Sequence, residues 1–118
     1  MSEKLQSSPR KVLIVEDSGN WQSLLPRLFE DEGVEAIVVD SAEKAKIALE
    51  EGGFTEIITD GLEGEWTDVV DNAGDVPVRL LSGDGRHKEL AESKGIPFFD
   101  KADLDIDGLV KQHEPKNL

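Results

Sequence analysis

Short apolar segments alternate with stretches of helical periodicity along the chain. Five segments have the length of a strand, and most of them are rich in Val, Ile or Phe. They are KVLIV (11–15), VEAIVV (34–39), FTEIIT (54–59), VPVRLL (76–81) and IPFF (96–99). Because strands alternate with helical stretches, the order predicts an α/β domain in which a parallel sheet carries helices on both faces.

The intervening stretches predict five helices, which we recognise by apolar spacing and by residues that favour helix ends. In chain order they are 21–28 after Ser18, 42–49 after Ser41, 66–73, GRHKELAESKG (85–95) and a segment that begins near Asp103. In the last helix, Leu109 and Val110 are expected on the inner side. Ser18 and Ser41 are the candidate N-caps.

Length and charge restrict the classes of function. The 118 residues suit one domain, which we place at 11–113, between a flexible arm (1–10) and a tail (114–118). A formal net charge of −13 argues against nucleic acid and anionic membranes as direct partners. The chain has no cysteine and no apolar run long enough to span a bilayer. We therefore expect a cytoplasmic protein.

Polar side chains follow four of the predicted strands. Ligands of open α/β sheets bind beyond the carboxyl ends of the strands, so these positions are the ones to inspect. They are Glu16 and Asp17 after the first strand, Asp60 after the third, Ser82 after the fourth and Lys101 after the fifth. Carboxylates gathered at one edge repel each other unless a cation neutralises them, and Mg²⁺ prefers such hard oxygen ligands. Lys101 and Ser82 would supply a charge and a hydrogen-bond donor for a tetrahedral anion.

This arrangement resembles the receiver (CheY-like) domain of two-component response regulators over about residues 10–113. The resemblance implies a flavodoxin-like, doubly wound (βα)5 fold with strand order 2-1-3-4-5. It also implies that Asp60 accepts a phosphoryl group from a phosphohistidine, supplied by a histidine kinase or a histidine phosphotransfer protein. In this interpretation the chain is a stand-alone receiver, and its only chemistry is self-catalysed transfer to Asp60 followed by slow autodephosphorylation.

The same resemblance assigns roles to individual residues. Glu16, Asp17, Asp60 and the backbone carbonyl of Leu62 would hold Mg²⁺. Lys101 would pair with a phosphoryl oxygen, and Ser82 would move towards another. Phe98, three residues before the lysine, takes the position of the aromatic switch. A downstream protein would bind the face formed by the fourth helix, the fifth strand and the fifth helix, at about 85–113.

Two features depart from the family pattern. Ala102 follows Lys101 where the family has proline after a cis peptide bond, a bond that costs about 2.5–4 kcal/mol before other residues. The sequence DGLEGEW (60–66) also replaces a loop that usually contains Met-Pro. These departures favour an alternative, a degenerate receiver that takes no phosphoryl group and acts as a protein-interaction module.

Other interpretations remain for the single residues. Glu16 and Asp17 alone would suit a solvated strand end, and Asp60 alone a turn or helix cap. A Mg²⁺-dependent hydrolase of the haloacid type would need a second aspartate at position 62, which is Leu62. His87 and His113 have no second ligand at metal spacing, so we expect exposed side chains there. Trp21 and Trp66 suit packing positions, although either could border a partner surface.

Overall fold

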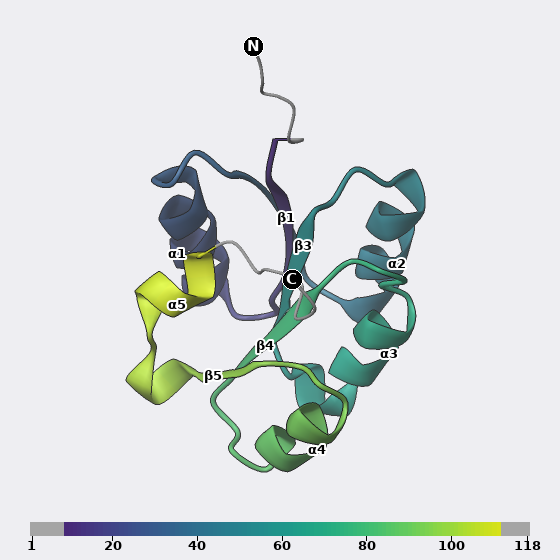
Figure 1. The fold of residues 1–118 in the computed structure, drawn as a ribbon, viewed down its shortest axis with the longest axis vertical. Helices are drawn as coiled ribbons and strands as arrows, with labels where there is room; N and C mark the ends of the chain where they lie inside the picture. The colour runs from purple at the N-terminus through teal and green to yellow at the C-terminus, as the bar shows by residue number, and fades with distance from the viewer. Residues whose placement is uncertain (1–8, 112–118) are drawn as a thin grey trace.

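The computed structural model describes residues 9–111, which form a parallel sheet between two layers of helices (Figure 1). The strands are β1 (Lys11–Val15), β2 (Glu35–Val39), β3 (Glu56–Thr59), β4 (Val78–Ser82) and β5 (Phe98–Asp100). Their order is β2-β1-β3-β4-β5 and all pairs are parallel, which confirms the predicted topology. Most of the predicted arm, the tail and His113 lie outside the described residues.

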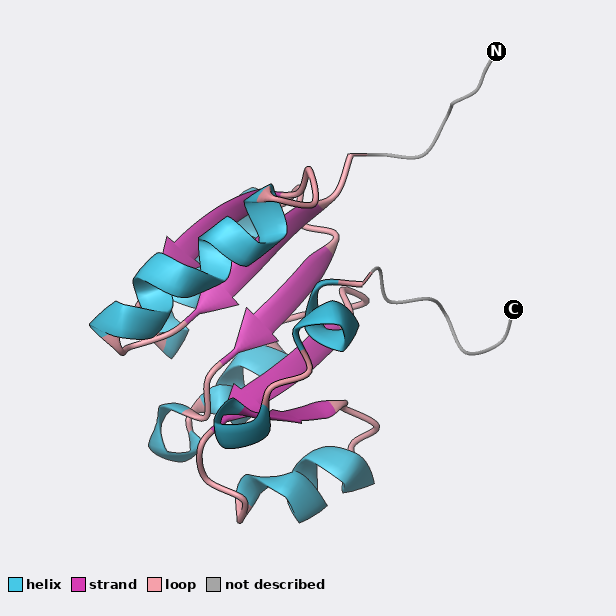
Figure 2. Ribbon diagram, turned by 90° about the vertical axis from the view of Figure 1, so that its left-hand side faces the viewer, coloured by secondary structure: helices cyan, strands magenta, loops and turns pink. Residues whose placement is uncertain are grey.

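The helices cover both faces of the sheet. They are α1 (Gly19–Glu30), α2 (Ala42–Glu51), α3 (Trp66–Asp71), α4 (His87–Ser93) and α5 (Ile106–Val110), with 3-10 turns η2 (Leu62–Gly64) and η3 (Lys101–Asp103). Figure 1 shows α1 and α5 on one side of the sheet and α2, α3 and α4 on the other. Figure 2 shows the strand arrows all pointing towards one edge of the sheet. Among residues 9–111, no helix is long and apolar enough to cross a membrane.

Side-chain alternation along the strands builds two cores. Successive residues of a strand point to opposite faces, so a fully buried strand contributes to both layers. Val12 and Ile14 of β1 pack with Leu25 and Phe29 of α1 on one face. The intervening residues of β1 pack with α2 and α3 on the other face. The central strands β1, β3 and β4 are almost entirely buried, whereas the edge strands β2 and β5 are partly exposed.

The helix ends agree with the sequence in part. Ser41 caps α2, because its hydroxyl oxygen accepts the backbone N–H of Lys44 at 3.1 Å. Ser18 occupies the N-cap position of α1 without making a side-chain capping bond. The predicted start of the last helix near Asp103 is wrong. Asp105 caps α5, accepting the Gly108 N–H at 3.0 Å, so this helix starts at Ile106.

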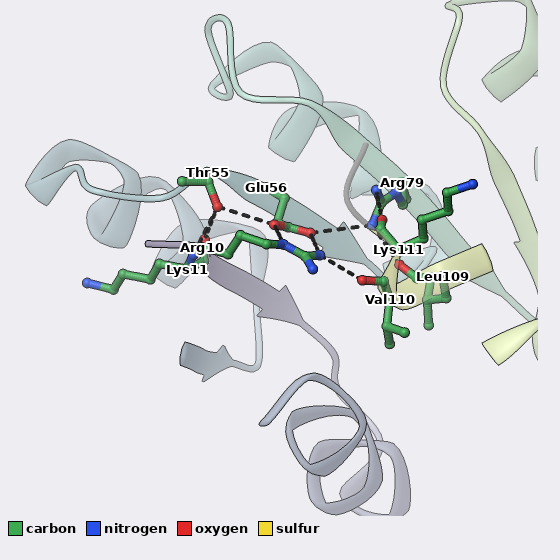
Figure 3. Close-up of polar contacts among 8 residues, drawn as sticks. All are labelled: Arg10, Lys11, Thr55, Glu56, Arg79, Leu109, Val110 and Lys111. Atoms are coloured by element: carbon green, nitrogen blue, oxygen red, sulfur yellow. Dashed lines mark hydrogen bonds and ion pairs between the residues drawn. The ribbon is translucent and has the colours of Figure 1, made fainter. Parts of the chain in front are cut away.

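A buried ionic cluster closes the amino-terminal edge of the sheet (Figure 3). The Glu56 carboxylate, on β3, accepts two hydrogen bonds from the Arg10 guanidinium, at 2.7 and 2.8 Å, and lies 3.5 Å from Arg79 Nη1. The two arginines also donate to the last carbonyls of α5: Arg10 to Val110 at 2.7 Å, and Arg79 to Leu109 at 2.6 Å. Arg10, which we assigned to the flexible arm, is therefore in contact with the sheet and with α5.

Candidate functional site

The carboxyl ends of the strands bring the predicted residues to one edge. The backbone N–H of Asp60 donates to the carbonyl of Val15 at 2.7 Å, so the residues that follow β1 and β3 lie side by side. In the same way, β4 and β5 pair Ser82 with Asp100, the residue before Lys101. Parallel pairing thus collects side chains that are distant in sequence at one position.

Three carboxylates form the centre of this site. Oxygen atoms of Glu16, Asp17 and Asp60 all lie within 4.8 Å of one another. Their exposure differs: Glu16 is buried, with 1% of its surface accessible, Asp60 is half-buried and Asp17 is exposed. Two carboxylates are therefore held by the protein while the third faces solvent.

Lys101 bridges the two inner carboxylates. Its Nζ lies 2.8 Å from Asp60 Oδ1 and 2.9 Å from Glu16 Oε1, and it donates to Glu16 Oε2 at 3.1 Å. The peptide bond from Lys101 to Ala102 is trans. Lys101 begins the 3-10 turn η3, and the Asp100 side chain accepts the Ala102 N–H at its start. The lysine therefore reaches both carboxylates from a trans peptide bond.

Both carboxylate oxygens of Asp60 have partners. Lys101 occupies Oδ1, and the backbone N–H of Leu62 donates to Oδ2 at 3.0 Å. Leu62 has a φ of 50°, in the left-handed region that residues with side chains seldom adopt. Its carbonyl, the expected metal ligand, accepts the Glu65 N–H at 3.1 Å and retains a second lone pair. Asp60 is thus fixed in orientation from two sides.

The charges at this site do not balance, because three carboxylates face one ammonium group. Burial is the main cause that raises the pKa of Glu16 above its usual value, and the charge of Asp60 acts in the same direction. Burial acts to lower the pKa of Lys101, but the hydrogen bonds to Asp60 and Glu16 outweigh it and raise this pKa above 10.5. Lys101 is therefore firmly charged, whereas the ionised form of Glu16 is disfavoured.

The donor set suits a small divalent cation. Glu16 Oε1 is buried and makes no aligned hydrogen bond with the residues that the structure describes; its neighbour at 2.9 Å is the Lys101 ammonium. A buried oxygen without a hydrogen bond, beside an exposed carboxylate and the half-buried Asp60, offers the hard ligands that Mg²⁺ takes. Glu16, Asp17, Asp60 and the Leu62 carbonyl are the residues that could hold it.

Ser82 lies at the same edge and is buried, with 3% of its surface exposed. Its hydroxyl oxygen accepts the backbone N–H of Asp84 at 3.0 Å and lies 3.2 Å from Nδ1 of His87. The expectation that His87 is solvent-exposed is therefore wrong: its side chain is 19% exposed and lies beside Ser82 and the ring of Trp66. The sequence signal was its place at the start of a helix five residues after Ser82.

One aromatic residue, Trp21, borders the site, and the predicted switch residue Phe98 lies further back on β5. The Lys101 ammonium lies 5.0 Å from the ring centroid of Trp21, in a cation–π contact that the sequence did not predict. Phe98 is half-buried and packs against a small core cluster that contains Trp66 and Leu80. Its role as a switch stays a prediction.

Comparison with known proteins identifies the fold. No protein-family model matches the sequence, and no curated protein matches it either. A response regulator receiver protein from Pseudomonas putida has a TM-score of 0.76 at 22% identity, and the match covers 89% of this chain and 95% of that one. The chain has the fold of a receiver domain.

Two further structures agree with this receiver fold. One is the receiver domain of a sensor histidine kinase from Pseudomonas aeruginosa PAO1, with a TM-score of 0.71, 18% identity and coverage of 86% of this chain and 92% of that one. That structure has a magnesium ion coordinated in its active site cleft. The other is the chemotaxis protein CheY4 of Vibrio cholerae, with a TM-score of 0.68, 18% identity and coverage of 87% and 94%. The fold class expected from the sequence is thus confirmed.

Proposed function

We propose that this receiver domain accepts a phosphoryl group on Asp60 in a Mg²⁺-dependent reaction with a phosphohistidine donor. The observation that carries the proposal is the meeting of Asp60 with Glu16, Asp17 and Lys101 at the carboxyl edge of the sheet. The donor would be a histidine kinase or a histidine phosphotransfer protein. The magnesium ion in the Pseudomonas aeruginosa receiver supports the choice of metal.

The geometry suits attack by Asp60 on phosphorus. A carboxylate oxygen of Asp60 would bond to phosphorus as the bond from phosphorus to the donor imidazole nitrogen breaks, leaving an aspartyl phosphate. The Leu62 N–H fixes Oδ2, and Lys101 holds Oδ1 until it passes to a phosphoryl oxygen. When bound by Glu16, Asp17 and Asp60, Mg²⁺ would neutralise charge that develops on the equatorial oxygens.

The proposal treats the protein as a single-turnover acceptor and not as an enzyme acting on a separate substrate. A haloacid-type hydrolase would need an acid at position 62, where the buried Leu62 has none. The output would pass to a protein partner at the face of α4, β5 and α5. Leu90 and Ile106 on this face are 47% and 44% exposed, which is consistent with a docking role.

Intact-mass spectrometry tests this function directly. After treatment with acetyl phosphate and Mg²⁺, the wild-type protein should gain one phosphoryl group, and chelation of Mg²⁺ should prevent the gain. Asp60→Asn should abolish it. Asp75→Asn is the matched control, because Asp75 is an exposed aspartate just before β4, away from the carboxyl edge.

The same measurement distinguishes the proposed function from the alternative. A degenerate receiver that acts only as an interaction module would keep its unmodified mass under all conditions. Phosphorylation that persists in Asp60→Asn would refute Asp60 as the acceptor.

A further inference from the structure

The hydroxyl group of Ser82 has two hydrogen-bonding neighbours in this structure. One lone pair of its oxygen accepts the Asp84 N–H, and His87 Nδ1 lies 3.2 Å away. A hydroxyl has a single proton to donate. If Nδ1 accepts that proton, Ser82 cannot give it to a second acceptor at the same time.

His87 is placed directly beside the residue that follows Asp60. A Cβ atom built on Gly61 would lie 2.6 Å from both Cε1 and Nδ1 of the His87 ring, and 3.1 Å from Ser82 Oγ. The backbone of Gly61, with φ −67° and ψ −27°, would suit any residue. With His87 in this position only glycine leaves enough space, and the imidazole lies next to the proposed acceptor.

Neighbouring side chains hold the imidazole in this position. The ring centroids of His87 and Trp66 are 6.2 Å apart at a tilt of 53°, and Trp66 is almost fully buried. On the other side of the ring, Nε2 lies 4.0 Å from Asp84 Oδ2, beyond hydrogen-bond distance, and a neutral imidazole with its proton on Nε2 would leave Nδ1 as an acceptor for Ser82. The packing thus places Nδ1 beside Ser82.

We propose that His87 is a positioning residue. Its Nδ1 accepts a hydrogen bond from the Ser82 hydroxyl in the unphosphorylated protein, and this bond breaks when Asp60 carries a phosphoryl group. The inference rests on the proposed function, in which Ser82 donates to a phosphoryl oxygen. Since one proton serves both acceptors, the two hydrogen bonds exclude each other. Phosphorylation of Asp60 would therefore release the His87 side chain, at the first residue of α4, from its bond with Ser82. This would link the state of Asp60 to α4 by a route separate from the movement expected of Phe98.

The consequence is that the bond between Ser82 and His87 weakens binding of a phosphoryl group. A typical net hydrogen-bond contribution corresponds to about a 2- to 10-fold change in an equilibrium constant. His87→Phe keeps a ring of similar shape above Gly61 but removes Nδ1, so it isolates the hydrogen bond from the packing. His87→Ala removes both.

The test is the affinity of the full chain for beryllofluoride, a phosphoryl mimic, in the presence of Mg²⁺. We expect His87→Phe to bind beryllofluoride about 2- to 10-fold more tightly than wild type. In a Ser82→Ala background the same substitution should have no effect. Glu89→Ala, an exposed change on α4, is the control and should behave as wild type.

The tautomer of His87 gives a second, independent readout that needs no phosphoryl mimic. Nitrogen-15 spectra of the unmodified protein should show Nδ1 without a proton, with a chemical shift that changes in Ser82→Ala. A proton on Nδ1 would overturn the proposal, and so would equal or weaker beryllofluoride binding by His87→Phe while wild type still binds.

Failure of the function itself has a different signature. Wild-type protein would then bind no beryllofluoride and gain no phosphoryl group, and both proposals would fall together. If wild type is phosphorylated on Asp60 but His87→Phe behaves as wild type, only the role of His87 is refuted.

Discussion

The two ends of the sheet each bury a glutamate beside basic side chains, yet the two clusters differ in how well they are satisfied. At the amino-terminal edge, Glu56 faces two guanidinium groups, from Arg10 and Arg79, and both of its oxygens accept hydrogen bonds (Figure 3). At the carboxyl edge, Glu16 shares one ammonium group with Asp60 and has one oxygen without a hydrogen bond. The cluster around Glu56 has excess positive charge, and its spare N–H groups donate to backbone carbonyl oxygens. The cluster around Glu16 has excess negative charge.

This difference separates a structural cluster from a functional one. The spare N–H groups of the arginines bind the carbonyls that end α5, where positive charge is favourable because of the helix dipole. The hydrogen bonds to Glu56 are the main cause that raises the pKa of Arg10. The excess negative charge at Glu16, Asp17 and Asp60 has no such partner among residues 9–111. This imbalance agrees with the proposed function, in which a cation and a phosphoryl group bind at the carboxyl edge.

The largest expected effect is at the structural cluster. Arg79→Leu should lower the free energy of unfolding by about 3 kcal/mol, because it leaves the carbonyls of Leu109 and Lys111 without their donor, while Glu56 keeps its two hydrogen bonds from Arg10. Urea denaturation followed by circular dichroism measures the change. Arg86→Leu is the control: Arg86 pairs with Asp84 at the surface, so its loss should leave stability unchanged. Equal losses in the two variants would refute the distinction.

A smaller effect is expected when Mg²⁺ reaches the carboxyl edge. An ion that binds only the folded protein stabilises it by about 2.7 kcal/mol at 100 times its dissociation constant. We expect Mg²⁺ to raise the unfolding free energy of wild type, measured by urea denaturation at a series of concentrations. Asp17→Asn should need more Mg²⁺ for the same gain, whereas Asp75→Asn should not. Identical responses of all three proteins would place the ion elsewhere.

The smallest effect concerns the charge of Glu16 without metal. Because its pKa is raised in the folded protein, ionised Glu16 lowers stability at neutral pH, and Glu16→Gln should be more stable than wild type by about 1 kcal/mol. As the pH falls towards 4.5, the folded carboxyl takes up a proton and this difference should shrink, reaching zero only below 4.5. Urea denaturation of both proteins between pH 7 and 4.5 measures it. A difference that grows as the pH falls would contradict the assignment.

Much of the fold and the site followed from local signals. The sequence predicted the strand segments, their parallel order and the residues that follow each strand. It could do so because the period of apolar residues differs between strands and helices. The carboxylates and Lys101 could be placed together because parallel strands end at one edge. Helix ends were harder to predict from the sequence. The third helix ends at Asp71 and not at residue 73, and α5 begins at Ile106 and not near Asp103. Side-chain caps and turns compete with helix at those positions.

The sequence by itself determined the alternation of strands and helices, and hence that Glu16, Asp60 and Lys101 meet at one edge of the sheet. Only the tertiary structure decided the contact of Lys101 with Trp21 and the position of His87 against Gly61. The reason is physical: periodicity depends on neighbours along the chain, whereas these two contacts join segments that approach each other only after folding. His87 shows the difference most clearly: its place five residues after Ser82 suggests a contact with that hydroxyl, but the sequence does not show that its ring lies against Gly61.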